Sequence, residues 1–172
     1  MGTLYGIKDP NDNPQTNEMV TDYINKTELD KDFNFRPKKE DDYKGVSEYF
    51  ENSYPEALIF DKNGKQLLYK INAEDCNAGL FRVIPTLTKD TKLESGQLTL
   101  DELLSKLDKM DNNEKSLETS DYDYLLAINW AVFMGKKLNK DHVLEWEKLA
   151  KNNTNCKIQI IKVNMDLKKE WQ

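Results

Sequence analysis

The strongest pattern in the chain is a nearly continuous apolar run in its C-terminal third. Residues 124–130 are apolar apart from one asparagine, which is typical of a strand that is buried on both faces of a parallel sheet. Asp141 can then cap a helix that carries apolar residues at helical spacing to about residue 152, and residues 158–164 form a second run, rich in β-branched residues. Strand, helix and strand in this order predict a parallel βαβ unit with a right-handed crossover, in which the helix packs across both strands.

A second clear pattern in the middle of the chain predicts a β-hairpin. Residues 57–60 and 66–69 are strand-like, and the segment between them contains Asn63-Gly64. An Asn-Gly pair suits the positive φ angles of a tight turn between antiparallel strands.

The other apolar positions predict shorter elements around this hairpin. Apolar residues recur at helical spacing in four segments: residues 16–29, 42–52, 74–84 and 100–110. Thr16 and Thr99 are suitable N-caps for the first and the last of these helices. Short strands are expected at residues 4–7 and 33–35.

These elements predict an α/β sandwich with a mixed central sheet and flanking helices. The chain has 172 residues, which suits one domain over residues 4–172. Residues 111–120 are polar and are the best candidate for an internal boundary.

The charge of the chain excludes some partners and favours others. The formal net charge is −6 and the pI is about 5.0, so phosphate backbones are repelled and we expect no nucleic-acid partner. No apolar run is long enough for a membrane-spanning segment. The start Met1-Gly2-Thr3 is typical of an engineered junction, and the composition is rich in Asn, Lys, Asp and Tyr. We therefore expect a bacterial protein that works outside the cytoplasm and whose targeting segment was removed.

The residues after the first apolar strand resemble the thioredoxin signature, in which a hydrophobic strand runs into W-A-x-W-C-G-P-C. The matching residues are Trp130, Ala131 and Gly135, with Phe133 in place of the second Trp. Met134 stands at the position of the nucleophilic cysteine, Lys136 at that of the proline and Lys137 at that of the resolving cysteine. The resemblance implies a thioredoxin-like fold without the dithiol.

Tyr54-Pro55 and the hairpin that follows resemble the other hallmark of the thioredoxin-like family, a cis-proline before a strand and a tight turn. The resemblance implies that the Tyr54–Pro55 bond is cis and that this loop faces the degenerate signature and binds a substrate chain. The two hallmarks occur in reversed order. Either the domain is permuted, or residues 4–85 form a small thioredoxin-like unit to which the βαβ unit is appended.

The two cysteines and the single histidine do not form the pattern of a known metal or catalytic site. Cys76 precedes a helical run and Cys156 precedes a strand, and we interpret them as a semi-buried structural cysteine and a turn or strand-edge residue. His142 is the only histidine and is expected at the surface of a helix start, so no zinc site is predicted. We expect no metal and no cofactor.

The function that these residues favour is that of a non-catalytic thioredoxin-like protein. It would bind a polypeptide or an envelope partner through Tyr54, Pro55, Trp130, Phe133, Met134 and Lys137. Two alternatives stay open: a thiol-dependent redox protein that uses Cys76 with or without Cys156, and a structural accessory domain of a bacterial envelope lipoprotein. In the favoured interpretation the protein has no enzymatic activity and does not reduce insulin disulfides.

Overall fold

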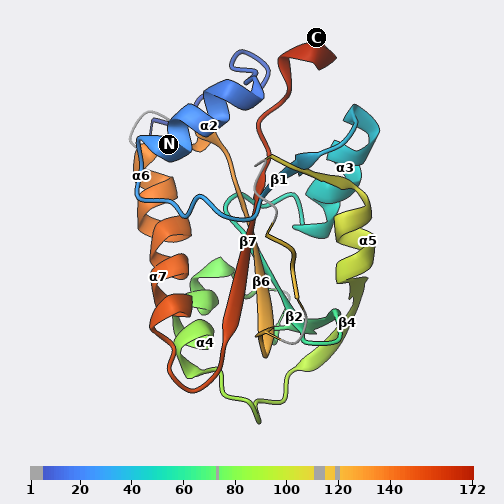
Figure 1. The fold of residues 1–172 in the computed structure, drawn as a ribbon, viewed down its shortest axis with the longest axis vertical. Helices are drawn as coiled ribbons and strands as arrows, with labels where there is room; N and C mark the ends of the chain where they lie inside the picture. The colour runs from blue at the N-terminus through green and yellow to red at the C-terminus, as the bar shows by residue number, and fades with distance from the viewer. Residues whose placement is uncertain (1–5, 73, 111–114, 119–120) are drawn as a thin grey trace.

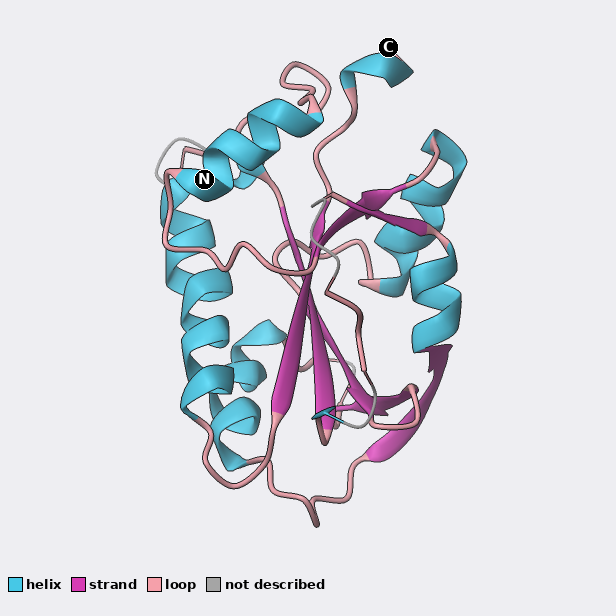
Figure 2. Ribbon diagram, viewed as in Figure 1, coloured by secondary structure: helices cyan, strands magenta, loops and turns pink. Residues whose placement is uncertain are grey.

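The central feature of the protein is a mixed seven-stranded sheet with the strand order β4-β3-β2-β6-β7-β1-β5. It is seen in a computed structural model that describes residues 6–72, 74–110, 115–118 and 121–172. Helices cover both faces of this sheet (Figures 1 and 2). The prediction of an α/β sandwich with a mixed sheet is confirmed.

The elements have the following bounds. The strands are β1 Asn34–Pro37, β2 Ala57–Asp61, β3 Lys65–Leu68, β4 Glu94–Thr99, β5 Leu107–Lys109, β6 Tyr124–Trp130 and β7 Ile158–Asn164. The helices are α2 Asn17–Asn25, α3 Glu40–Tyr49, α4 Leu80–Thr86, α5 Leu100–Ser105, α6 Lys136–Leu138 and α7 Glu145–Asn152. A π-helical segment, Asn139–Leu144, joins α6 to α7 without a break.

The predicted βαβ unit is present. β6 and β7 are parallel neighbours in register from Tyr124–Ile158 to Trp130–Asn164, and every residue of β6 is buried. The helix between them starts at Lys136 and not at a cap on Asp141, which lies within the π-helical segment. Helix α7 packs across the sheet as expected, with Trp146 fully buried.

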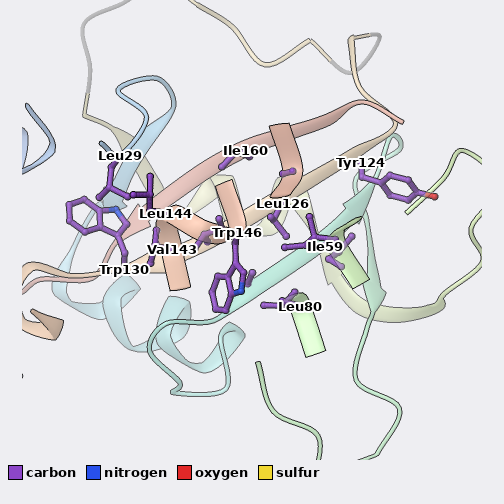
Figure 3. Close-up of a cluster of buried hydrophobic side chains, with 14 of the residues drawn as sticks. Leu29, Ile59, Leu80, Tyr124, Leu126, Trp130, Val143, Leu144, Trp146 and Ile160 are labelled. Atoms are coloured by element: carbon purple, nitrogen blue, oxygen red, sulfur yellow. The ribbon is translucent and has the colours of Figure 1, made fainter. Parts of the chain in front are cut away.

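Alternate residues of β6 enter two different hydrophobic clusters because a strand points successive side chains to opposite faces. Tyr124, Leu126, Ile128 and Trp130 face the side of α2, α4 and α7, where they pack with Trp146 and others (Figure 3). Leu125 and Ala127 face the side of α3 and α5. Figure 1 shows these two groups of helices on opposite sides of the sheet.

The predicted hairpin is also present, with one difference in its turn. β2 and β3 pair antiparallel, and the Asp61 carboxylate accepts hydrogen bonds from the backbone N–H groups of Asn63 and Lys65, both at 2.9 Å. Gly64 has a φ of 77°, whereas Asn63 does not have a positive φ. The turn therefore needs the glycine but not the left-handed asparagine that the pattern predicted.

Three other expectations about elements were wrong in part. In the expected strand at 4–7, Leu4 and Tyr5 lie outside the described residues, and Gly6 and Ile7 are not in a strand. The helix expected over 74–84 is a 3-10 turn, Asn77–Gly79, followed by α4. The helix expected over 100–110 ends at Ser105, because Leu107–Lys109 pairs with β1 as strand β5.

The strands on either side of residues 111–120 belong to the same sheet. Most of that segment lies outside the described residues, and its possible role as a boundary stays a prediction. Among the residues that the structure describes, no helix is both long and apolar enough to cross a membrane.

Candidate functional site

The segment that resembles the thioredoxin signature forms a tight loop after β6, which we call the β6 loop (residues 131–135). It contains a 3-10 turn, Val132–Met134. The carboxylate of Asp166 accepts hydrogen bonds from the backbone N–H groups of Val132 at 2.7 Å and Phe133 at 3.2 Å. The loop is therefore held in place by a side chain from the end of the neighbouring strand β7.

Asp166 is fully buried, and its carboxylate is surrounded by hydrogen-bond donors. Burial raises its pKa, and this effect outweighs the hydrogen bonds from Val132, Asn164 and Phe133 and the nearby charge of Arg36. Arg36, also buried, donates to the backbone carbonyl of Asp166 at 3.0 Å. Sequence reasoning missed both residues, although a polar Asn164-Met-Asp166 run at the end of a buried strand was a usable signal.

The Tyr54–Pro55 bond is cis, which confirms the prediction. The ring of Tyr54 contacts that of Phe133 edge-on, with 5.9 Å between the centroids. Tyr54 packs with Ala131, Phe133 and Met134 in a small apolar cluster, and Pro55 is buried beside it. The structure therefore brings Tyr54, Phe133 and Met134 together, as the resemblance implied.

The backbone on either side of Tyr54 is held by amide side chains. The Asn129 side chain accepts from the backbone N–H of Glu56 at 2.6 Å and donates to the carbonyl of Ser53 at 2.7 Å. Asn77 donates to the carbonyl of Pro55 at 2.6 Å. Within the described part of the chain, the backbone N–H and C=O of Tyr54 itself have no hydrogen-bond partner. One unpaired donor and one unpaired acceptor thus stand beside the apolar cluster.

The N-terminal segment of the chain reaches the same loop. The backbone N–H of Lys8 donates to the carbonyl of Phe133 at 2.8 Å, and residues 6–9 are exposed to solvent. A carbonyl of the β6 loop is therefore able to pair with an extended stretch of polypeptide.

Two of the predicted site residues lie elsewhere. Trp130 is fully buried on the other face of the sheet, where its ring lies 5.6 Å from that of Tyr23. Lys137 is exposed, with its ammonium 3.6 Å from the carboxylate of Asp141 one helical turn later. Neither is placed in the cluster of Tyr54 and Phe133, so the candidate site is smaller than the sequence suggested.

The two cysteines are not bonded to each other. Cys76 is exposed, so the expectation of a semi-buried structural residue was wrong. Cys156 is buried in the core, where its thiol donates to the carbonyl of Leu87 at 3.4 Å and burial raises its pKa. It lies in the bend directly before β7, in keeping with the turn position that the sequence indicated, and its side chain points into the core.

His142 also differs from its expected place. It is partly buried in the π-helical segment, with its ring 5.7 Å from those of Phe81 and Trp146. Its environment is aromatic. Across the described ranges, no group of three or more His, Cys, Asp and Glu side chains is arranged to hold a metal ion.

A polar cluster at the start of β2 was also missed by sequence reasoning. Glu56, which is 2% exposed, lies 2.8 Å from the ammonium of Lys70 and accepts a hydrogen bond from the hydroxyl of Tyr69. Burial alone lowers the pKa of Lys70, but its hydrogen bonds to Glu51 and Glu56 raise it above the usual value. The partners of this cluster are satisfied by one another, as is typical of a structural network.

Comparison with known proteins finds no match: no family model, no curated protein and no solved structure is significantly similar to this chain.

Proposed function

We propose that the protein is a non-catalytic, thioredoxin-like protein that binds an extended polypeptide alongside Tyr54 and the β6 loop. The observation that carries the proposal is the unpaired backbone N–H and C=O of Tyr54 among the described residues, next to the apolar cluster of Phe133 and Met134. An extended chain can satisfy such a donor and acceptor by adding to the edge of the backbone, as in β-augmentation.

The arrangement of the strands supports the thioredoxin-like part of the proposal. The resemblance implies that the proline loop and the degenerate signature face each other. Here β2 and β6 are antiparallel neighbours, and the loops at Tyr54 and Phe133 meet at the same end of the sheet.

The chain's own N-terminal segment supports the polypeptide part. The hydrogen bond from Lys8 to the carbonyl of Phe133 is a contact of the kind that a bound polypeptide would make. A partner would either extend this pairing or replace residues 6–9 at the loop.

The side chains at the former thiol positions support a non-catalytic role. Met134 is 1% exposed and carries a thioether, and Lys137 is a surface cation. Thiol–disulfide exchange needs a thiolate nucleophile and a second thiol close to it. We therefore expect no reduction of insulin disulfides with dithiothreitol as the electron source, under conditions in which an ordinary thioredoxin turns over; comparable turnover would contradict the non-catalytic role.

Photo-crosslinking tests the binding role directly. The photoreactive residue p-benzoylphenylalanine is placed at Tyr54, and in a matched control at Phe81, an aromatic residue on α4 that is 36% exposed. The probe is reduced, carboxymethylated α-lactalbumin, a permanently unfolded polypeptide, with the native disulfide-bonded protein as the folded control. We expect crosslinking of the unfolded form from position 54 and little from position 81. Equal crosslinking from both positions, or none from position 54, would refute a binding site at this loop.

The alternative of a thiol-dependent redox protein has its accessible sulfur at Cys76, since Cys156 is a core residue. The alternative of an accessory domain of an envelope lipoprotein stays a prediction from the sequence.

A further inference from the structure

A cavity separate from the Tyr54 site lies between the C-terminal end of α2 and the helix that starts at Lys136. It has a volume of about 400 Å³, which is within the usual range for pockets that bind small molecules. We call it the α2–α6 cavity. Its lining residues come from the two helices and the segment after α2: Tyr23, Leu29, Lys136, Asn139, Lys140 and Leu144, with four others.

The apolar part of the lining belongs to the core. Leu29 and Leu144 are 4% and 7% exposed and are members of the same cluster as Trp130. Figure 3 shows these two leucines beside the Trp130 ring. An apolar group that enters the cavity would therefore meet a surface that is already ordered by packing.

The polar part of the lining is built around a buried amide. Asn139 is 3% exposed, and its side-chain N–H groups donate to the hydroxyl of Tyr23 at 3.0 Å and to the carbonyl of Ala131 at 2.9 Å. Its side-chain oxygen has no hydrogen-bond partner. Because the Tyr23 hydroxyl accepts from Asn139, its own proton is available to an acceptor in the cavity, and burial raises the pKa of Tyr23 and keeps it protonated.

The charged part of the lining is mostly positive. Lys136 and Lys140 are exposed at the rim, and within the described ranges neither has an ion-pair partner. Lys26 also lines the cavity, and its ammonium is 3.6 Å from Asp22. The one acidic lining residue, Glu28, lies 3.8 Å from Lys148. In a chain of net charge −6, this is a local excess of positive charge that attracts anions.

We propose that the α2–α6 cavity binds a small amphipathic anion, a molecule with one carboxylate or similar group on an apolar body. The apolar body packs against Leu29 and Leu144, and the anionic group lies at the rim between Lys136 and Lys140, within reach of the Tyr23 hydroxyl. The site uses none of the residues proposed to bind a polypeptide, so the two proposals stand or fall separately.

The test uses two fluorescent probes that differ in one charged group. 1-Anilinonaphthalene-8-sulfonate carries an anionic sulfonate, and N-phenyl-1-naphthylamine has the same rings without it. The variant is Lys136→Glu with Lys140→Glu. The matched control is Lys62→Glu with Lys92→Glu, which makes the same change in net charge at two other exposed lysines.

We expect the wild-type protein to bind the anionic probe in a saturable one-to-one manner. The cavity variant should weaken this binding by about tenfold, because it replaces two favourable surface charge contacts with unfavourable ones. The same variant should change binding of the neutral probe less than about twofold, because both probes keep the same apolar contacts. The control variant should leave both affinities close to those of the wild type.

Displacement then tests the class of ligand. Octanoate should displace the anionic probe at a lower concentration than octanol, which lacks the charged group, and inorganic phosphate at the same concentration should not displace it. The proposal is overturned if the anionic probe does not bind saturably, if the cavity and control variants weaken it equally, or if phosphate displaces it as well as octanoate does.

Discussion

The parallel and antiparallel halves of the sheet differ in how far their charged and polar side chains are buried. The parallel half, β6, β7 and β1, contains the fully or almost fully buried Lys162 and Arg36 and is followed at once by buried Asp166. In the antiparallel half, the polar side chains of β3 and β4 are largely in contact with water. The polar side chains of a strand that is covered on both faces cannot hydrogen-bond to water. Each of them therefore needs a partner from another element.

Those partners come from far along the chain. Lys162 lies 2.7 Å from the Glu147 carboxylate on α7, at angles outside those of a hydrogen bond, so the contact is an ion pair. The second oxygen of Glu147 accepts from the backbone N–H of Asp30 at 3.2 Å. The parallel half therefore depends on a few buried pairings, whereas water can replace the polar contacts of β3 and β4.

The largest effect should come from breaking the buried ion pair. Glu147→Gln leaves the ammonium of Lys162 buried without a counter-charge and should lower the free energy of unfolding by about 3–5 kcal/mol. Urea denaturation measures it. The matched control is Glu145→Gln on the same helix, whose exposed pair with Lys148 at 3.2 Å should contribute about 1 kcal/mol or less.

A second substitution distinguishes charge from packing at this pair. Glu147→Gln combined with Lys162→Met removes both charges and should recover most of the lost stability, because no unpaired charge remains. A double variant no more stable than Glu147→Gln alone would contradict the electrostatic explanation.

A smaller effect is expected where one carboxylate holds two backbone N–H groups. Asp166→Ala leaves the N–H groups of Val132 and Phe133 without their acceptor in a buried place, and should cost about 2–3 kcal/mol. Asp61→Ala removes the same kind of contact from the hairpin turn, where water can replace it, and should cost about 1 kcal/mol or less.

Hydrogen exchange at the β6 loop sharpens this second comparison. In Asp166→Ala the amide of Val132 should exchange faster while amides of the β2–β3 hairpin keep their rates, and Asp61→Ala should have the opposite effect. Equal costs for the two variants would show that burial does not decide the strength of these contacts.

The smallest effect concerns alkaline pH and the antiparallel half. Burial and the hydrogen bond to Glu56 raise the pKa of Tyr69 above its usual value of 10.0. The folded protein therefore keeps this proton at a pH where the unfolded chain loses it, so the stabilisation is complete below pH 10 and decreases as the pH rises above it. Urea denaturation between pH 8 and about pH 12 should show a shallower loss of stability for Tyr69→Phe than for the wild type.

The control for this prediction is Tyr49→Phe on α3. Tyr49 is half-buried, and among the described residues its hydroxyl makes no hydrogen bond. Tyr69→Phe should also cost about 1 kcal/mol at neutral pH through the lost hydrogen bond. A pH profile of Tyr69→Phe that runs parallel to that of the wild type would show that Tyr69 does not contribute to the alkaline loss.

The elements that were predicted well are those whose side-chain pattern alone specifies the structure. β6 and β7 are apolar along their length, and the β2–β3 hairpin has a turn that Gly64 can adopt. The two strands that the side-chain pattern did not predict, β4 and β5, form through backbone pairing with neighbouring strands. β4 has a polar sequence but pairs with β3, and Leu107 follows the helical period of α5 but pairs with Pro37 of β1.

One part of the candidate site was predictable, because the resemblance to the thioredoxin-like family implied a contact between two segments that are far apart in the sequence. The approach of Tyr54 to Phe133 followed from the thioredoxin-like resemblance and from no property of either segment. The sequence marks Asp166 as a polar residue at the end of a buried strand, but its contact with the N–H groups of Val132 and Phe133, 34 and 33 residues away, was not predictable. The role of Asn139 was likewise not predictable, since its partner Tyr23 lies 116 residues away.

The two buried parallel strands, the hairpin and the absence of a thiol from the β6 loop can all be inferred from the amino-acid sequence. These follow from side-chain type and period, which act over a few neighbouring residues. In contrast, the ion pair of Lys162 with Glu147, the hydrogen bonds of Asp166 to the β6 loop and the α2–α6 cavity beside Asn139 all depend on tertiary packing. Burial sets the strength of a charge or a hydrogen bond, and burial depends on which distant segments pack together.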